Sequence, residues 1–189
     1  MLHLKPVDRR FCRRWTLATT AAIALCNPLG VIGLLIGPIV LAIAQGLVLR
    51  RYYAPFVWWG VATIGGGYGA IALFIVWALA WSSVPLPLMV FVCGAIVGCP
   101  QAWVLRRGSR LWGWWPLVNA VILTVSIAWF VPDMVDAAIY GTRRILWHWV
   151  ALAALTGLIG GCLKGLALVW FLKKRPAPTQ DADAPAVCN

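Results

Sequence analysis

Acidic residues are nearly absent from this chain of 189 residues. It contains no glutamate, and its aspartates are Asp8, Asp133, Asp136, Asp181 and Asp183. None of these carboxylates falls inside an apolar stretch, so the sequence offers no buried acid–base pair and no intramembrane carboxylate. This scarcity argues against general acid–base catalysis and against transport coupled to protons or sodium ions. We therefore expect a protein that is not an enzyme.

Patterns that build metal or disulfide sites are also missing. The six cysteines are scattered without any Cys-x-x-Cys pair, and the two histidines, His3 and His148, are far apart in the sequence. The run Gly65–Gly67 lies within an apolar stretch and does not match a phosphate-binding loop. We expect free thiols, no metal site and no cofactor beyond bound lipid, apart from the pigment considered for His148.

What is abundant is apolar sequence. Hydrophobic residues make up 62% of the chain, charged residues 11%, and the mean hydropathy is +0.87, which is typical of a polytopic membrane protein. Many of the 13 tryptophans stand near the ends of apolar runs, where indole rings suit the lipid–water boundary. The net charge of +11 comes from basic clusters between apolar runs, so we expect no nucleic-acid partner.

The apolar runs predict an all-α integral membrane protein with six transmembrane helices. The predicted spans are residues 11–26, 29–49, 55–81, 88–105, 112–130 and 145–172. A hydrocarbon core requires ~20 residues per helix, and the first and fifth spans are the marginal ones. Pro38 should kink the second span, because it lacks a backbone N–H.

The basic residues fix the expected orientation. They cluster in residues 1–14, 50–51, 106–110 and 173–175, and such clusters stay on the cytoplasmic side. We expect a cytoplasmic basic N-terminus (1–10), a transmembrane domain (11–175) and a cytoplasmic tail (176–189) that is disordered unless bound. This places the protein in a bacterial inner membrane, either cytoplasmic or photosynthetic, with both termini in the cytoplasm.

A short pattern recurs in the second, fourth and sixth spans. With Gln45, Gln101 and Lys164 in register, a leucine follows four residues later in each copy (Leu49, Leu105, Leu168). Small residues lie four apart around them, and these are Ala42, Gly46, Gly94, Gly98, Ala102, Gly157, Gly161 and Gly165. Strips of small residues let helices pack closely in a membrane. We expect these three helices to pack on one another.

The preceding spans repeat as well. Trp15 with Thr19 matches Trp59 with Thr63, and more weakly Trp115 with Asn119. Each unit is then a helical hairpin, over residues 11–51, 55–107 and 112–174. Three such hairpins predict a pseudo-threefold bundle.

Three polar residues occupy equivalent positions in the returning helices, and they define the main candidate site. Threefold packing would bring Gln45, Gln101 and Lys164 to a shared locus. A charge at the bilayer centre costs about 2.5–3.5 kcal/mol, and no Asp or Glu of this chain lies at that depth. Lys164 either snorkels to the cytoplasmic headgroups while the glutamines bond between helices, or binds a lipid phosphate or another anionic ligand, or binds a carboxylate of a partner subunit.

His148 is the one histidine near a span, between Trp147 and Trp149. It is either a member of an interfacial aromatic belt or a ligand of a haem iron or of a pigment magnesium. Ligation of one haem by both histidines is excluded, because His3 is expected on the opposite side.

The ends of two of these helices also carry a resemblance. Ala44–Arg50 reads Ala-Gln-Gly-Leu-Val-Leu-Arg, and the Gln-x-x-x-Leu-Arg-Arg pattern returns at Gln101–Arg107. The chain thereby resembles uncharacterised multipass bacterial membrane proteins with repeated Ala-Gln-x-x-Val-Leu-Arg helix ends. The third copy departs from the pattern, with Lys164 in place of glutamine. The resemblance implies a membrane location and no particular activity.

These observations lead to one functional hypothesis and one alternative. The hypothesis is a non-catalytic structural or accessory subunit of a larger membrane complex, such as a respiratory or photosynthetic one, with lipids and other membrane subunits as partners. The alternative is a channel or transporter for a small solute or an anion, with Gln45, Gln101 and Lys164 lining its path.

Overall fold

The computed structural model describes residues 6–26, 29, 31–52, 56–80, 84–106, 109–128 and 146–173, and this part of the chain is all-helical. Its six α-helices are α1 (Pro6–Cys26), α2 (Val31–Leu49), α3 (Phe56–Ala80), α4 (Leu86–Leu105), α5 (Trp115–Ala128) and α7 (Leu146–Lys173). One turn of 3-10 helix, η2 (Trp112–Trp114), leads directly into α5. Each helix overlaps one predicted span, so the prediction of six helices in this order is confirmed.

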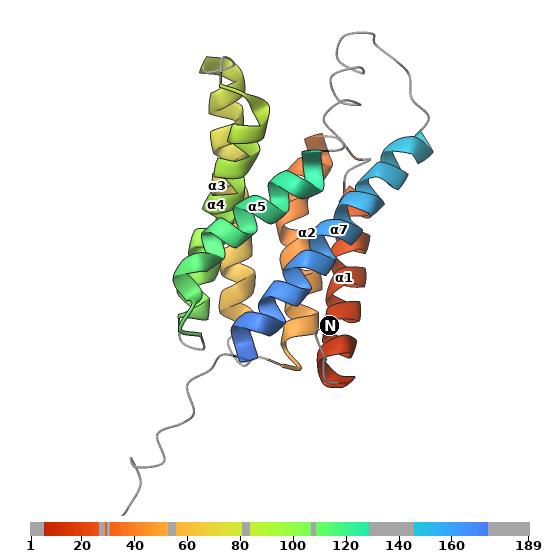
Figure 1. Ribbon diagram of the computed structural model, residues 1–189. Coiled ribbons are helices and arrows are strands. Elements are labelled where there is room, and N and C mark those ends of the chain that lie inside the picture. Colours follow the sequence, from red (N-terminus) through yellow and green to blue (C-terminus); the bar gives the residue numbers. More distant parts are fainter. Residues whose placement is uncertain are drawn as a thin grey trace, which may run out of the picture.

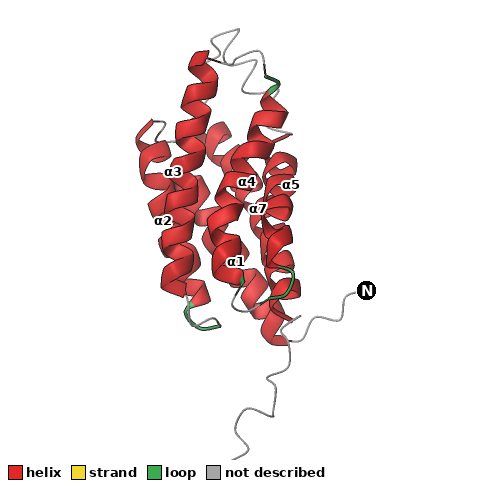
Figure 2. Cartoon of the chain, turned by 90° about the vertical axis from the view of Figure 1, so that its left-hand side faces the viewer, coloured by secondary structure: helices red, strands yellow, loops and turns green. Residues whose placement is uncertain are grey.

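The helices lie side by side in a bundle, with α5 and α7 inclined to the others (Figure 1). Each helix packs on the helices that precede and follow it along the chain, and α1 also packs on α7. The principal contacts therefore form a closed cycle. The loop residues that the structure describes lie at the two ends of the bundle (Figure 2).

Four of the helices are long and apolar enough to cross a membrane, judged by length and composition. They are α2, α3, α4 and α7, with apolar windows of mean hydropathy between 1.7 and 2.4. The other two helices are α1 and α5, which correspond to the marginal first and fifth predicted spans. The first half of α1 carries Arg9, Arg10, Arg13 and Arg14, and α5 has only 14 residues.

Prolines inside two helices do not end them. α2 continues through Pro38, and α4 continues through Pro100. On the neighbouring helix α3, a Cβ atom built on Gly67 would lie only 2.7 Å from Pro38 Cβ. The glycine run therefore makes room for α2, as expected for a segment that another helix approaches closely.

The sequence predicts that the small-residue strips of α4 and α7 meet one another at the centre, but the structure does not bring them together. A Cβ atom built on Gly94 or on Gly98 would lie 2.6 Å from a backbone Cα atom of α5. One built on Gly157 would lie 2.7 Å from Thr20 Cα in α1. The expectation that the three returning helices pack on each other is wrong, because the strip of α4 faces α5, the strip of α7 faces α1, and the principal helix contacts do not join α2, α4 and α7.

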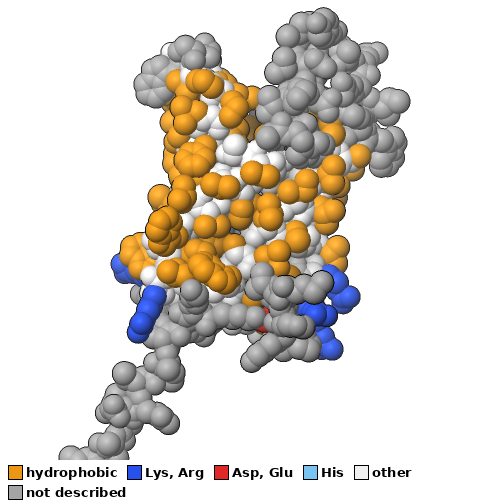
Figure 3. Space-filling model, in the orientation of Figure 1, with side chains coloured by type: hydrophobic (Ala, Val, Ile, Leu, Met, Phe, Trp, Pro, Cys, Tyr) orange, Lys and Arg blue, Asp and Glu red, His pale blue; other side chains and the backbone are white. Residues whose placement is uncertain are grey.

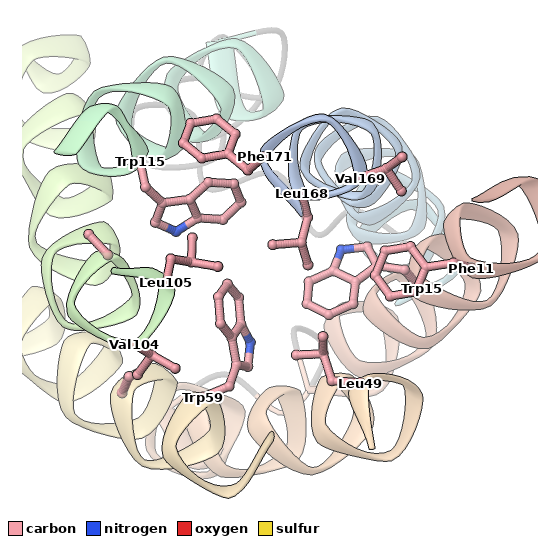
Figure 4. Close-up of a cluster of buried hydrophobic side chains, with 12 residues drawn as sticks. Phe11, Trp15, Leu49, Trp59, Val104, Leu105, Trp115, Leu168, Val169 and Phe171 are labelled. Atoms are coloured by element: carbon pink, nitrogen blue, oxygen red, sulfur yellow. The ribbon is translucent and has the colours of Figure 1, made fainter. Parts of the chain in front are cut away.

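Large side chains fill the centre near one end of the bundle instead. The tryptophans Trp15, Trp59 and Trp115 are almost fully buried, and the ring of Trp59 lies 5.9 Å from that of Trp15 and 5.8 Å from that of Trp115. Both contacts are edge-to-face, an arrangement that aromatic rings favour. The leucines of the repeated pattern, Leu49, Leu105 and Leu168, are buried among them, and the side chains point toward one another (Figure 4).

Basic side chains gather at this same end of the bundle. Arg50 and Arg51 follow α2, Arg106 follows α4, and Arg110 precedes η2. On the face drawn in Figure 3, the visible Lys and Arg side chains lie at the lower end and hydrophobic side chains cover the surface above them. The outer surface is strongly apolar, with Leu25 69% exposed and Leu79 83% exposed.

Some predictions fall outside the described residues. These include the polar connection near residues 131–144, the cytoplasmic tail from residue 176 and Lys5 before the first helix.

Candidate functional site

Equivalent polar residues of the three predicted hairpins define three groups that we call junctions, and two of them are hydrogen-bonded. Each junction contains the Gln or Lys of one hairpin, the Thr or Asn of the same hairpin, and the Trp of the next one. The first junction is Thr19, Gln45 and Trp59; the second is Thr63, Gln101 and Trp115; the third is Asn119, Lys164 and Trp15.

The second junction is fully bonded. Trp115 Nε1 donates to Gln101 Oε1 at 3.0 Å, and Gln101 Nε2 donates to Thr63 Oγ1 at 2.9 Å. All three side chains are buried. One glutamine therefore satisfies both an indole N–H from α5 and a hydroxyl oxygen from α3, which ties three helices together.

The first junction repeats this arrangement. Trp59 Nε1 donates to Gln45 Oε1 at 3.1 Å, and Gln45 Nε2 donates to Thr19 Oγ1 at 3.5 Å. Gln45 is 2% exposed, so its amide depends on these partners. Each glutamine is thus bonded within its own junction, and the described bonds do not join Gln45 to Gln101 at one shared locus.

The third junction differs in its chemistry. The indole N–H of Trp15 is fully buried and has no hydrogen-bond acceptor in the part of the chain that the structure describes. Asn119 Nδ2 donates to the Gly94 carbonyl oxygen at 2.7 Å, while the buried Asn119 Oδ1 has no described donor. In the first two junctions the indole N–H has an acceptor and the threonine hydroxyl oxygen has a donor. The corresponding atoms of the third junction, Trp15 Nε1 and Asn119 Oδ1, have no partner among the described residues.

The residue that replaces glutamine in this junction differs in its hydrogen-bonding groups. A glutamine amide has an oxygen that accepts a hydrogen bond and an NH₂ group that donates two. The ammonium group of Lys164 has only donors, so it cannot accept from Trp15. Lys164 is half-buried, and no hydrogen bond or ion pair of its side chain is found among the described residues.

The position of Trp15 supports this comparison. α7 lies against α1 at Gly161, where a Cβ atom would be 3.2 Å from Thr16 Cα. One helical turn later, a Cβ on Gly165 would be 3.1 Å from Trp15 Cδ1, the ring carbon bonded to Nε1. The nitrogen edge of the Trp15 indole therefore faces α7 near Gly165, and Figure 4 shows the ring nitrogen on the side of that helix.

The remaining predicted packing residues lie as follows. Ala42 and Ala102 are buried, with exposed fractions of 3% and 2%. Gly46 is also buried, but no heavy atom lies within 4 Å of a Cβ atom built on it, so this glycine is not required for a close approach. His148 falls within α7, and its side chain lies outside the described ones.

Sequence reasoning noticed Trp15, Trp59, Trp115 and the matching Thr or Asn residues only as repeat markers. Sequence reasoning did not identify Trp59, Trp115, Thr19 and Thr63 as hydrogen-bond partners of the glutamines. The available signal was the position of each Thr or Asn, four residues after its tryptophan and on the same helical face.

Comparisons with known proteins add no homologue to this description. No protein-family model, no curated protein and no solved structure matches the chain.

Proposed function

We propose that the chain is a non-catalytic protein of a bacterial inner membrane, made of three repeated helical hairpins in a pseudo-threefold bundle. The apolar outer surface and the basic end of the bundle support a membrane location with that end and both termini in the cytoplasm. The two bonded junctions support the repeat, because equivalent residues of successive hairpins make equivalent contacts.

Within that membrane the protein is proposed to act as an accessory subunit of a larger complex. The third junction carries this proposal, because it combines an unpaired buried indole N–H with a half-buried lysine. A carboxylate from a partner subunit has two acceptor oxygens. It could accept hydrogen bonds from both Trp15 Nε1 and Lys164 Nζ. Such bonds to a charged acceptor are stronger than bonds to a neutral one.

A carboxylate also fits the energetics of the position. An ammonium group in an apolar environment is stabilised by an opposite charge and by hydrogen bonds to its partners. The rest of the Lys164 donors could then reach Asn119 Oδ1, as the glutamine amides reach Thr19 and Thr63 in the other junctions.

The test is copurification from native membranes in a mild detergent. The wild-type chain is expected to bring down a defined membrane protein, and Lys164→Met is expected to lose it because the charge is gone. Arg110→Gln, which removes a cation outside the junctions, is the matched control and should retain the partner. A wild-type chain that purifies alone, or a Lys164→Met variant that keeps the same partner, would contradict the subunit role.

The channel alternative gains less support from the geometry. The side chains of Trp15, Trp59, Trp115, Leu49, Leu105 and Leu168 fill the centre at the level of the junctions, and each is less than 2% exposed. A solute would have to displace these side chains to pass along the bundle axis. Pigment binding through His148 stays a prediction that the absorption spectrum of the purified protein would test.

A further inference from the structure

A groove of about 640 Å³ lies between α1 and α2 on the outside of the bundle. Its floor is formed by small side chains that are buried or half-buried, among them Ala18, Ala22 and Ala44. Larger side chains form its rims, including Leu17 and Leu47, which are 59% and 52% exposed. The groove is therefore an open, mainly apolar depression on the outer surface that runs along two helices.

One end of this groove is strongly basic. Arg14 of α1 lines it together with Arg50 and Arg51, which follow α2. All three side chains are exposed, and no ion pair of theirs is found among the residues that the structure describes. Among those residues the one acidic side chain is Asp8, which is not part of the groove lining.

The other end is apolar. From Arg14 to Leu25 the groove follows α1 for eleven residues, which is roughly 16 Å at the rise of an α-helix. No charged residue lines the groove between these two positions or along α2 before Arg50. The groove therefore has the polarity of one phospholipid molecule, with a site for an anion at one end and a site for a hydrocarbon chain along the rest.

We propose that this groove binds an anionic glycerophospholipid. Its phosphate lies between Arg14, Arg50 and Arg51, and one acyl chain lies over the alanine floor. Guanidinium groups suit phosphate because they donate parallel hydrogen bonds to its oxygens. Basic pockets beside transmembrane helices on the cytoplasmic side are sites where anionic headgroups bind. The proposal rests on the proposed membrane location, and it is independent of the partner at Lys164.

The experiment measures lipid retention by native mass spectrometry. The full chain in mild detergent is mixed with equal amounts of phosphatidylglycerol, which is anionic, and phosphatidylcholine, which is zwitterionic. Wild-type protein should retain the anionic lipid selectively. Arg50→Gln with Arg51→Gln should weaken that retention roughly 25-fold, at about fivefold for each basic residue near a membrane surface. Arg106→Gln with Arg110→Gln removes the same charge at the same end of the bundle and should leave retention unchanged.

A second variant tests the acyl site without changing any charge. Ala44→Phe fills the floor of the groove and should displace the lipid, while Ala78→Phe, at an exposed position of α3, should not. Inorganic phosphate is added in a separate sample. If it competes fully, or if Ala44→Phe has no effect, the arginines bind a free anion and the lipid proposal is wrong.

Three further results would also overturn it. These are equal retention of the two lipids, equal losses in the control variants, and no lipid retained by the wild-type chain. Each variant is first shown to elute and melt as the wild type does. Failure of the membrane location would appear separately, as a chain recovered in the soluble fraction. A chain in the membrane fraction without selective lipid retention would contradict the groove proposal alone.

Discussion

At the scale of single residues, the chain uses one hydrogen-bonding device twice and alters it once. Gln45 and Gln101 each accept from a tryptophan of the next hairpin and donate to a threonine of their own. The ammonium group of Lys164 cannot accept from the Trp15 N–H, which has no described partner, and Asn119 Oδ1 also has no described donor. A buried polar group without a partner costs about 1–3 kcal/mol, so the third junction lowers the stability of the isolated chain.

We predict that Lys164→Gln stabilises the isolated chain. The new amide oxygen would accept from Trp15 Nε1, and the amide nitrogen would donate to Asn119 Oδ1, as in the other two junctions. The expected gain is on the order of 1–3 kcal/mol. For a chain of this size it corresponds to a rise in Tm of about 2–12 °C. Thermal unfolding in detergent, followed by circular dichroism, measures it.

Lys164→Met is the matched control for that prediction. It also removes the charge, but it supplies neither an acceptor nor a donor to the junction. A Tm for Lys164→Gln that does not exceed that of Lys164→Met would show that the amide makes no bond there. It would then contradict the equivalence of the three junctions.

At the scale of the helices, close contact depends on a few glycines in α4 and α7. Gly94 and Gly98 lie one turn apart and face the backbone of α5 at Ala120 and Pro116. In a membrane such contacts are favourable because packing replaces the hydrophobic effect between helices. The same strip explains why α4 and α5 pack closely although α5 is the shortest of the helices.

We predict that Gly98→Ala separates α4 from α5. The added Cβ atom would lie 2.6 Å from Pro116 Cα, so one backbone must move, and overpacking of this kind costs roughly 1–3 kcal/mol. The shift would also strain the bond from Trp115 to Gln101, which lies one turn away. A fall in Tm measured by circular dichroism, with increased exposure of tryptophan to a fluorescence quencher, checks this result.

The matched control is Gly65→Ala in α3, where no heavy atom lies within 4 Å of the added Cβ. Alanine has the higher helix propensity, so this variant should be as stable as the wild type or slightly more stable. Equal Tm changes in the two variants would mean that helix propensity, and not the contact with α5, determines the effect.

At the scale of the whole molecule, one end of the bundle is basic, and the other end has no charged side chain among the residues that the structure describes. The antiparallel order of the helices brings Arg14, Arg50, Arg106 and Arg110 together, although they lie far apart in the sequence. In the proposed membrane location, retention of Lys and Arg in the cytoplasm is expected to orient the bundle, since all of these residues favour the same direction.

We predict the orientation from this asymmetry. A reporter enzyme that is active only outside the cytoplasm, fused after Pro85, should be active, because this position precedes α4 at the end opposite the arginines. The same reporter fused after Ser109 should be inactive. Both fusions must be produced in equal amounts, as judged by immunoblot. The reverse pattern of activity would contradict the proposed topology.

The sequence by itself determined the six helices, their order and the clustering of the arginines, because hydrophobic runs, prolines and charges act locally along the chain. It also marked Gly94 and Gly98 as packing positions, but it assigned them the wrong neighbour. Helical periodicity fixes which face of a helix is small without fixing which helix covers that face.

Only the tertiary structure decided which side chains meet. The bond from Trp59 to Gln45 joins different hairpins, so it depends on the rotation and depth of both helices, which no local pattern specifies. The same holds for the unpaired Trp15 and for the groove between α1 and α2. Contacts between hairpins are set by the packing of the whole cycle of helices, and the features proposed to bind a partner and a lipid arise from that packing.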